Sequence, residues 1–360
     1  MSGSSLDGLD IVYTELLENN GDWSFEILEA DCYAYSDEWI KKLKNAIHLS
    51  GFEYQLLHAE YGHYLGKEIN RFIEEKGLHY KVGLIASHGH TTFHLPAKKM
   101  TAQLGDGAAI AALTGLSVVS DLRALDVAFG GQGAPIVPIG EKLLWKEYDL
   151  FLNIGGIANI SFKKNDDFIA FDVCPANRVL NLLANKKGKE FDEGGAMAAA
   201  GNVDEQMLSD LNKLGYYHKP YPKSLANDFG TDEVFPLVES FEINTNDALR
   251  TYVEHIVQQI KIAVTGFENT NSGEFNSSRK LLVTGGGAFN TFLIGRLSEA
   301  LASLNIEVVV PKETIVKYKE ALVMALIGVL RWRQEYNVLA SVTGAQRNSI
   351  GGALWIGQEA

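Results

Sequence analysis

The stretch Asp149-Leu-Phe-Leu-Asn-Ile-Gly-Gly-Ile-Ala-Asn-Ile-Ser-Phe162 decides the fold of the second half of the chain. Residues that favour strands occupy 149–153 and 157–162, on either side of the pair Gly155-Gly156, and another apolar run covers 168–173. Short apolar runs separated by glycine turns are typical of strands that follow one another in a meander. The stretch therefore predicts two strands, and the run that follows it predicts a third.

The first half of the chain opens with a similar pattern. Segments 10–17 and 24–30 are rich in β-forming residues, and Asn19-Asn-Gly-Asp22 lies between them. Asn and Gly tolerate the positive φ that a tight hairpin turn needs. Two meanders, each followed by helical segments, predict a duplicated α/β architecture, although no residue-by-residue repeat is visible.

The remaining elements follow from the spacing of apolar residues and from glycine and proline. These patterns predict helices at 38–49, 60–75, 106–114, 247–267, 290–304 and 320–335, and further strands at 81–86, 116–119 and 280–283. The segment 121–138 is rich in Gly, Gln and Pro, and we interpret it as a hinge between two domains. The expected domains are 1–138, to which 339–360 returns, and 139–338.

The composition is that of a globular protein. Apolar residues make up 46% of the 360 residues, and 32 Lys and Arg against 45 Asp and Glu give a formal net charge of -13. No basic cluster forms a stripe, so nucleic acid is not an expected partner. Two cysteines are too few for a disulfide framework. The first residues show no basic segment followed by an apolar one, and the longest apolar run, 321–330, is too short to span a bilayer. These features predict a cytoplasmic protein that makes no membrane contact.

The N-terminal segment Met1-Ser-Gly-Ser-Ser-Leu-Asp-Gly-Leu-Asp10 is the first of three glycine sites. Its backbone N–H and hydroxyl groups could hold phosphates ahead of the first strand. Asp7 and Asp10 could hold a hydrated Mg²⁺, because this ion prefers one or two carboxylates with waters and phosphate oxygens. From these residues alone, a flexible start with a capping aspartate is the favoured alternative.

The other two glycine sites are Asn153-Ile-Gly-Gly-Ile-Ala-Asn159 and Gly285-Gly286-Gly287, which lies between a strand and a helix. Glycine lets the backbone approach a ligand closely, and a helix start offers unpaired N–H groups, so strand-glycine-helix suits a nucleotide. A single glycine pair is more often only a hairpin turn. The chain has no G-x-x-x-x-G-K-[ST] and no early G-x-G-x-x-G, which counts against P-loop proteins and dinucleotide-dependent dehydrogenases.

Taken in order, the three glycine sites resemble the phosphate and adenosine loops of the actin, hexokinase and acetate kinase superfamily. Asp121-Leu-Arg-Ala-Leu-Asp-Val-Ala-Phe-Gly-Gly-Gln-Gly-Ala-Pro-Ile-Val-Pro138, together with Ser87-His-Gly-His-Thr-Thr-Phe-His94, resembles the anhydro-N-acetylmuramic acid kinase family. Further matches lie at 104–108, 153–159, 172–177, 222–224, 285–290 and 341–345. The resemblance implies a two-domain actin-like ATPase fold, which is a duplicated ribonuclease H-like fold with a central cleft.

The resemblance also implies a reaction. The family uses ATP to phosphorylate O6 of 1,6-anhydro-N-acetylmuramic acid while water opens the 1,6-anhydro bridge, during peptidoglycan turnover and amino sugar catabolism. The family's catalytic base matches Asp172, and a glutamate that helps position the water matches Glu320. From the residues alone, Asp172 could equally cap a turn or helix. Glu320, in the first turn of the expected last helix, could act only on the helix dipole.

Other contacts are implied residue by residue. Arg123 could bind the lactyl carboxylate of the sugar or a phosphate, and an internal salt bridge is the alternative. The implied sugar contacts are His88, Thr91, Arg123, Asp126 and Gln132. The implied nucleotide contacts are Gly3, Ser4, Ser5, Asp7, Gly8, Asp10, Gly155, Gly156, Gly285, Gly286 and Gly287, with Asp7 and Asp10 also on Mg²⁺. The expected partners are a small sugar and a second copy of the chain in a homodimer.

The chain departs from the family at two motifs. The usual Asp-Thr-Gly-Pro-Gly-Asn is Asp172-Val-Cys-Pro-Ala-Asn177 here, and Lys-Ser-Thr-Gly-Arg-Glu is Lys223-Ser-Leu-Ala-Asn-Asp228. Cys174 and Ala176 add side-chain bulk, which predicts a narrower pocket or a different substrate. The alternatives are therefore a nucleotide-binding paralogue without turnover and a kinase for another amino sugar. Family members also carry a short strand before the first motif, so we expect a missing edge strand, from a truncated or misassigned start.

Overall fold

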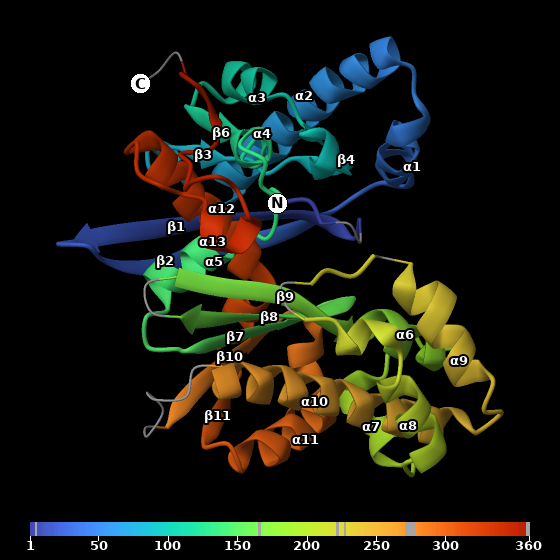
Figure 1. Cartoon of the computed structure of the whole chain (residues 1–360). Coiled ribbons are helices and arrows are strands. Elements are labelled where there is room, and N and C mark those ends of the chain that lie inside the picture. The colour runs from blue at the N-terminus through green and yellow to red at the C-terminus, as the bar shows by residue number, and fades with distance from the viewer. Residues whose placement is uncertain (4–5, 165–166, 221–222, 227, 271–277, 358–360) are drawn as a thin grey trace. The chain divides into compact units, whose positions relative to one another are not determined.

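The computed structural model describes residues 1–3, 6–164, 167–220, 223–226, 228–270 and 278–357. The chain forms two compact units. Unit 1 comprises Met1–Lys146 and Tyr318–Ala360, and unit 2 comprises Glu147–Lys317. Each unit combines β-strands with helices (Figure 1), which confirms the predicted α/β class. Among the described helices, none has the length and apolar character needed to span a bilayer.

Unit 2 contains a five-stranded sheet in the order β11-β10-β7-β8-β9. Strand β10 is parallel to β7 and β11, whereas β8 is antiparallel to β7 and β9. The predicted meander is thus confirmed, and the strand order 3-2-1-4-5 with the second strand reversed is the ribonuclease H-like arrangement that the resemblance implies. The strands are β7 (Leu150–Ile154), β8 (Ile157–Lys164), β9 (Asp167–Pro175), β10 (Arg279–Thr284) and β11 (Ile306–Val309).

The helices of unit 2 cover this sheet and share its hydrophobic core. Residues 251–257 of α10 are all buried, so this part of the helix is enclosed on every side, and its apolar side chains pack into the core. Helices α10 and α11 lie side by side (Figure 1). The helices are α6 (Asn177–Asn185), α7 (Ala196–Ala199), α8 (Glu205–Asn212), α9 (Phe235–Glu239), α10 (Thr245–Thr270) and α11 (Thr291–Ala302), with a π-helical turn at Phe229–Val234.

Unit 1 opens with a long antiparallel hairpin of β1 (Gly8–Asn19) and β2 (Asp22–Ala34). Its turn contains Asn20 at φ 53° and Gly21 at φ 86°, so the positive φ predicted for this turn is confirmed. Both strands are longer than the predicted segments. The hairpin has a register shift between Tyr13 and Thr14, which is a β-bulge that adds local twist.

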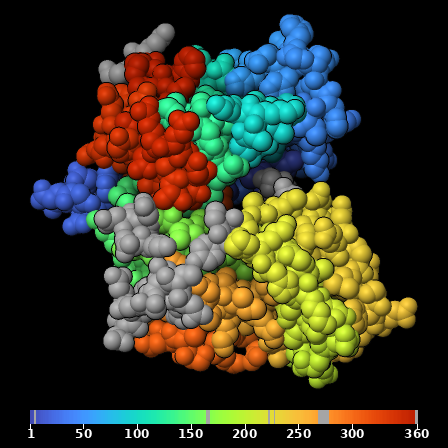
Figure 2. All heavy atoms as spheres, in the orientation of Figure 1, coloured from blue at the N-terminus to red at the C-terminus, as the bar shows by residue number. Residues whose placement is uncertain are grey.

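The rest of unit 1 combines two small sheets with helices. Strand β12 (Ala353–Trp355) is antiparallel to β6 (Val118–Ser120), which is parallel to β3 (Ile85–Ala86), while β4 (His90–Leu95) and β5 (Met100–Leu104) form a hairpin. Figure 2 shows C-terminal segments, in red, beside cyan and green segments from the first half of unit 1. The helices are α1 (Asp37–Asn45), α2 (Gly51–Glu75), α3 (Gly107–Thr114), α4 (Ala124–Ala128), α5 (Pro138–Leu144) and α13 (Ala340–Thr343).

The unit boundaries differ from the expected domain boundaries. The first boundary lies after Lys146 instead of residue 138, because α5 packs within unit 1. The Trp145 ring meets the Phe25 ring edge-on, with centroids 5.2 Å apart. A Cβ at Gly140 would lie 2.3 Å from Val323 Cγ2, so this part of α5 is in close contact with the C-terminal part of the unit. The segment 121–138 contains helix α4 and is therefore not a simple hinge loop.

The last long helix, α12 (Glu313–Trp332), begins earlier than predicted. Glu320 is therefore in the interior of the helix, and its expected place in the first turn is wrong. Thr314, Ile315 and Val316 are β-branched, which weakens the helical pattern in the sequence. Burial of Val316 in the core of unit 2 compensates for this low propensity, because tertiary packing overrides it.

Candidate active-site surfaces

Two of the three predicted glycine sites form one continuous surface on unit 2. Strands β7 and β10 are parallel, and Thr284 of β10 is paired with Asn153 of β7. The loops that follow these strands therefore leave the same edge of the sheet. A Cβ built at Gly285 would lie 2.6 Å from Asn153 Oδ1, and one at Gly286 would lie 3.5 Å from Asn177 Nδ2. The Gly155-Gly156 turn, Asn177 and residues 285–287 are thus neighbours.

Glycine is needed for different reasons at different positions of this surface. Gly285 has φ +82°, and a Cβ at Gly287 would lie 2.2 Å from Ile154 Cγ2, so both are required by the fold itself. At Gly156 the φ is outside the left-handed region, and the nearest protein atom to a built Cβ is 3.7 Å away. Gly156 is also exposed. A ligand that approaches the backbone closely would give this glycine a function.

The Gly155-Gly156 turn is fixed by the start of α6. Ala176 N–H donates to Gly156 O at 2.8 Å, and Asn177 N–H donates to Gly155 O at 3.0 Å. The C=O and N–H of one planar trans peptide point in opposite directions. The N–H groups of Gly156 and Ile157, which share peptides with these carbonyls, are therefore directed away from α6. Such oriented amides can bind an anion.

Asp172 lies near the end of β9, next to a β-bulge. It is paired with Asn159, while the neighbouring pair is Ala158 with Cys174, so Val173 is the extra residue on β9. Asp172 Oδ2 accepts hydrogen bonds from Ser224 Oγ at 3.1 Å and from Leu225 N–H at 2.8 Å. Bulges direct side chains and are frequent beside active sites. The carboxylate thus has a defined position.

The environment of Asp172 suits a general base. Burial raises the pKa of its carboxyl because the charged form loses hydration, and the hydrogen bonds from Leu225 and Ser224 lower it in part. Among the described residues, the hydrogen bonds that this carboxylate accepts both fall on Oδ2. Oδ1 can therefore accept a proton from another partner. A carboxylate with a raised pKa and an available oxygen is a competent base near neutral pH.

The substituted residues of the Asp172 motif do not lie where we expected. Cys174 and Ala176 are both 0% exposed and belong to the hydrophobic core of unit 2. Their side chains therefore pack against the interior and do not narrow a ligand pocket. The expected exposure of these two side chains to a ligand was wrong because a β-strand alternates its faces, and the bulge at Val173 sets which residues face the core.

Arg178 also reaches this surface, and we did not predict it from the sequence. A Cβ at Gly156 would lie 3.7 Å from Arg178 Nε and 3.8 Å from Nη2. One signal was available, because the sequence contains no acidic residue between Asp172 and Glu190 that could pair with this arginine along the helix.

On unit 1, Arg123 and His88 form a hydrogen-bonded pair. Arg123 Nε–H donates to His88 Nε2 at 2.8 Å, and Arg123 Nη1–H donates to Gly133 O at 2.6 Å. His88 Nδ1 lies 3.0 Å from Gly89 O, which only accepts, so Nδ1 carries the proton. Burial lowers the pKa of His88 to about 3, with a further contribution from Arg123. His88 is therefore a neutral acceptor that positions the guanidinium.

The other predicted sugar contacts of unit 1 have different surroundings. Asp126 is 0% exposed, and its carboxylate accepts from Gly133 N–H at 2.8 Å and Thr343 Oγ1 at 2.8 Å. These two hydrogen bonds make Asp126 a residue that holds this loop in place. Gln132 is exposed, and its backbone N–H donates to Thr343 O. Thr91 is exposed on β4.

Glu320 lies near Arg123 despite its unexpected position within α12. Burial lowers the pKa of Arg123 to about 10, and the charges of Glu320 and Asp126 act in the opposite direction. Glu320 is exposed, whereas the preceding Lys319 is buried and paired with Glu141 at 2.6 Å. Unit 1 therefore brings together three of the predicted residues, His88, Arg123 and Glu320.

The two ends of the N-terminal motif of unit 1 pair with each other in antiparallel orientation. Ser2 bridges Leu9, and Asp10 N–H donates to Met1 O at 3.0 Å. Burial raises the pKa of Asp10, and the charge of Asp7 acts in the same direction, so the two carboxylates are close enough to interact. A Cβ at Gly8 would lie 2.5 Å from Cys32 Sγ, which gives this glycine a packing role. Gly3 is partly buried, and the predicted phosphate contacts Ser4 and Ser5 lie outside the described residues.

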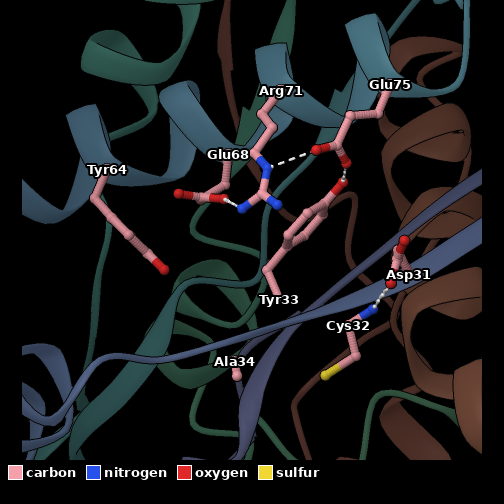
Figure 3. A pocket seen from close by; sticks show the side chains of 8 residues that line it. All are labelled: Asp31, Cys32, Tyr33, Ala34, Tyr64, Glu68, Arg71 and Glu75. Atoms are coloured by element: carbon pink, nitrogen blue, oxygen red, sulfur yellow. Dashed lines mark hydrogen bonds and ion pairs between the residues drawn. The ribbon is translucent and has the colours of Figure 1, made fainter.

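Unit 1 also has a cavity of about 400 Å³ that sequence analysis did not predict. Figure 3 shows Arg71 between Glu68 and Glu75, with the Tyr33 hydroxyl directed at Glu75. Glu75 accepts from both Tyr33 and Arg71, and Arg71 also pairs with Glu68, so these side chains compensate one another in part. Its lining residues are Asp31, Cys32, Tyr33, Ala34, Tyr64, Glu68, Arg71 and Glu75.

Comparison with known proteins identifies close sequence relatives along the whole chain. The model of the family described as anhydro-N-acetylmuramic acid kinase matches residues 1–357. The anhydro-N-acetylmuramic acid kinase of Francisella tularensis subsp. novicida is 32% identical over 380 residues, covering 98% of this chain and 97% of the relative. That of Photobacterium profundum is 30% identical over 371 residues, covering 99% of this chain and 97% of the relative.

Similarity to solved structures is more distant. A ROK family glucokinase from Streptomyces griseus in complex with glucose and AMPPNP has a TM-score of 0.39 and 9% identity, covering 88% of this chain and 99% of that chain. A putative N-acetylmannosamine kinase from Listeria monocytogenes has a TM-score of 0.35 and 12% identity, covering 86% and 92%. The family model and the full-length relatives carry the assignment: the chain belongs to the anhydro-N-acetylmuramic acid kinase family.

Proposed function

We propose that this protein uses ATP to convert 1,6-anhydro-N-acetylmuramic acid into N-acetylmuramic acid 6-phosphate, with Asp172 as the base. The observation that supports the proposal most directly is the carboxylate of Asp172. It is held through one oxygen, its pKa is raised by burial, and it stands in the motif that carries the base in the family. The substitutions at Cys174 and Ala176, which cast doubt on the substrate, lie in the core.

The proposed reaction joins hydrolysis of the anhydro bridge to phosphoryl transfer. The Asp172 carboxylate accepts a proton from water as the water oxygen bonds to the anomeric carbon, and the bond from that carbon to O6 breaks. O6 then bonds to the γ-phosphorus of ATP, and the bond from that phosphorus to the bridging oxygen of ADP breaks. The products are the 6-phosphosugar and ADP. Asp172 releases its proton to solvent afterwards.

The chain also offers groups for the nucleotide and its metal. We assign phosphate binding to the amides of the Gly155-Gly156 turn and adenosine binding to residues 285–287. Asp7 and Asp10 would hold Mg²⁺, because these two carboxylates are close enough to interact and a cation between them would relieve their repulsion. Mg²⁺ when bound neutralises charge on the phosphate oxygens.

Arg123 is the proposed contact for the lactyl carboxylate of the sugar. Two of its N–H groups are used by His88 and Gly133, so Nη2 remains to bind an anion. We keep Glu320 as the group that positions water, and Thr91 and Gln132 as sugar contacts. Asp126 would act only through the loop that it holds.

A labelling experiment tests the coupled reaction. Enzyme, ATP and 1,6-anhydro-N-acetylmuramic acid are incubated in ¹⁸O-water, and the product is analysed by mass spectrometry. We expect one label, at the anomeric oxygen. Product without that label would eliminate the hydrolytic step. ATP consumption with free amino sugars but not with the anhydro sugar would instead indicate a kinase for another amino sugar, and nucleotide binding without any turnover would indicate a paralogue that is not an enzyme.

Replacement of the base is the second test. Asp172→Asn should reduce kcat at least about 1,000-fold, because the amide cannot accept the proton, while ATP binding is unchanged. Turnover is followed by ADP release and binding by calorimetry. Asp210→Asn, which removes the charge of a half-buried aspartate paired with Lys213 in the same unit, is the matched control and should keep full activity. Wild-type turnover by Asp172→Asn would refute the assignment.

Two further proposals concern the whole protein. A homodimer and a cytoplasmic location are expected from the resemblance to the family. Light scattering coupled to size exclusion would give the mass in solution, and fractionation of the source cell would give the location. A monomer at micromolar concentration, or a secreted protein, would contradict them.

A further inference from the structure

Arg178 occupies an unusual position on unit 2. It is the second residue of α6, and its guanidinium lies over Gly156, with Nε 3.7 Å and Nη2 3.8 Å from a Cβ built at that glycine. A Cβ built at Gly230 would lie 3.4 Å from Arg178 Cδ, so the aliphatic part of the side chain adjoins Gly230. The side chain is therefore held between the glycine turn and the π-helical turn that contains Gly230.

The charge of Arg178 is not compensated by the described residues. Its Nε is buried without a hydrogen-bond partner, and no described carboxylate forms an ion pair with it. The first turn of α6 contains no acidic residue, and its N-cap Ala176 has no side-chain hydrogen bond to the helix. A cation is unfavourable near the positive end of a helix dipole. An unpaired arginine in this place costs stability unless an anion binds beside it.

The position of Arg178 also matches what a phosphate would need. The guanidinium adjoins exposed Gly156, whose peptide N–H is directed away from α6. A phosphate oxygen at the turn can accept from this amide and from the guanidinium together, because arginine offers several donors in one plane. The lack of a side chain at Gly156 leaves space for that oxygen.

We propose that Arg178 binds a phosphate group of the nucleotide at the Gly155-Gly156 turn. This inference rests on the ATP use proposed above. In the absence of nucleotide, Arg178 is a destabilising charge at the start of α6. Bound phosphate supplies its missing partner and pairs with the turn amides at the same time. Arg178 thus adds a positive charge to a surface that otherwise binds phosphate through backbone groups.

The test uses the full-length protein and three variants. Arg178→Met removes the charge, Arg178→Lys keeps it without the planar fork, and Lys186→Met removes a cation at the far end of α6 that is paired with Glu239 at 2.9 Å. Calorimetric titrations with ATP and with adenosine measure binding, and thermal unfolding without ligand measures stability. The adenosine titration separates phosphate contacts from base contacts.

We expect Arg178→Met to weaken ATP binding about 10- to 100-fold, the loss for one charge-assisted hydrogen-bonding group, without changing adenosine binding. Arg178→Lys should recover part of the affinity, and Lys186→Met should behave as wild type. The ligand-free Tm of Arg178→Met should equal or exceed that of the wild type, because an unfavourable charge is gone.

Two results would overturn the inference. One is an ATP affinity within twofold of wild type, and the other is an equal loss for adenosine together with a lower Tm, which would show a structural role. If the wild-type protein binds ATP but does not consume it with the anhydro sugar, the proposed function is refuted. The effect of Arg178 on ATP binding can still be measured in that case. Wild-type protein that binds no ATP would remove both.

Discussion

His255 illustrates how burial controls a single titratable side chain. It lies on α10 with 0% exposure, and Nδ1 lies 2.7 Å from Asn212 Oδ1 while Nε2 lies 2.9 Å from the Tyr217 hydroxyl. Burial lowers the pKa of His255 to about 3. The folded protein therefore keeps a neutral imidazole at pH values where the unfolded chain binds a proton, so stability depends on pH.

This difference predicts a loss of stability in mild acid. As pH falls from about 7 to about 5.5, the unfolded His255 gains a proton and the folded one does not, which lowers the free energy of unfolding by about 1 kcal/mol. His255→Gln should be destabilised at both pH values but lose about 1 kcal/mol less than wild type over this range. Urea unfolding followed by circular dichroism at the two pH values gives the difference.

Exposed His48 supplies the control for this measurement. His48→Gln should retain the wild-type pH dependence. Equal pH dependence in wild type and His255→Gln would contradict a neutral buried imidazole.

At the residue scale, sequence motifs singled out Asp172, Arg123 and His88 as candidates because their neighbours form long, ordered patterns, and the roles of these residues stay predictions. They did not predict the environment of Asp126, because it depends on Thr343, which is distant in the sequence, as well as on nearby Gly133. Arg178 was missed for a similar reason. Only the fold shows that its guanidinium lies over the Gly155-Gly156 turn.

At the element scale, the buried ion pair between α5 and α12 gives a stability prediction. Lys319 Nζ lies 2.6 Å from Glu141 Oε1 and 5.6 Å from the centre of the Trp145 ring, and both charged residues are buried. Lys319→Met should lower the free energy of unfolding by about 3 kcal/mol, because it leaves a buried carboxylate without its main charge partner. Chemical denaturation measures this loss.

The ion pair should contribute less to the free energy of unfolding than is lost when only one of its two partners is removed. The double variant Lys319→Met with Glu141→Met should recover most of the lost stability, since two packed methionines replace two desolvated charges. Lys317→Met breaks an exposed pair with Glu313 on the same helix and should cost less than about 0.5 kcal/mol. A double variant no more stable than Lys319→Met would argue against this account.

Elements were predicted well where periodicity is simple. Strands predicted at 149–153 and 157–162 are β7 (Leu150–Ile154) and β8 (Ile157–Lys164), because apolar runs and glycine turns determine them. The start of α2 was missed by nine residues, although Ser50 and Glu53 form a capping box there. Its first turn lacks the buried face that periodicity detects, since Phe52 is 74% exposed.

At the scale of the whole molecule, the two units have separate hydrophobic cores. One core cluster lies within 150–316 and the other within 6–118, so each belongs to a single unit. Unit 2 is also continuous in sequence. We therefore expect the fragment Glu147–Lys317 to fold alone and unfold cooperatively, because its core is complete. Dispersed amide signals in a two-dimensional NMR spectrum would confirm this, and a collapsed spectrum would refute it.

The division into two units was expected from the repeated meander, but its boundaries were not. The sequence shows glycine and proline at 121–138, which favours a hinge there. The position of the boundary depends on the packing of Trp145 and Gly140 within unit 1, and no local pattern encodes that packing. Contacts between residues distant in the sequence therefore determine the unit boundary, which composition alone does not predict.

The pairing of β12 with β6 affects how the protein is made. Residues 118–120 and 353–355 are neighbours in space, yet a ribosome synthesises all of unit 2 between them. Unit 2 can thus finish folding while the nascent chain is still attached, whereas unit 1 waits for the last residues. We expect chaperones that bind exposed strand edges to associate with the nascent chain during this interval.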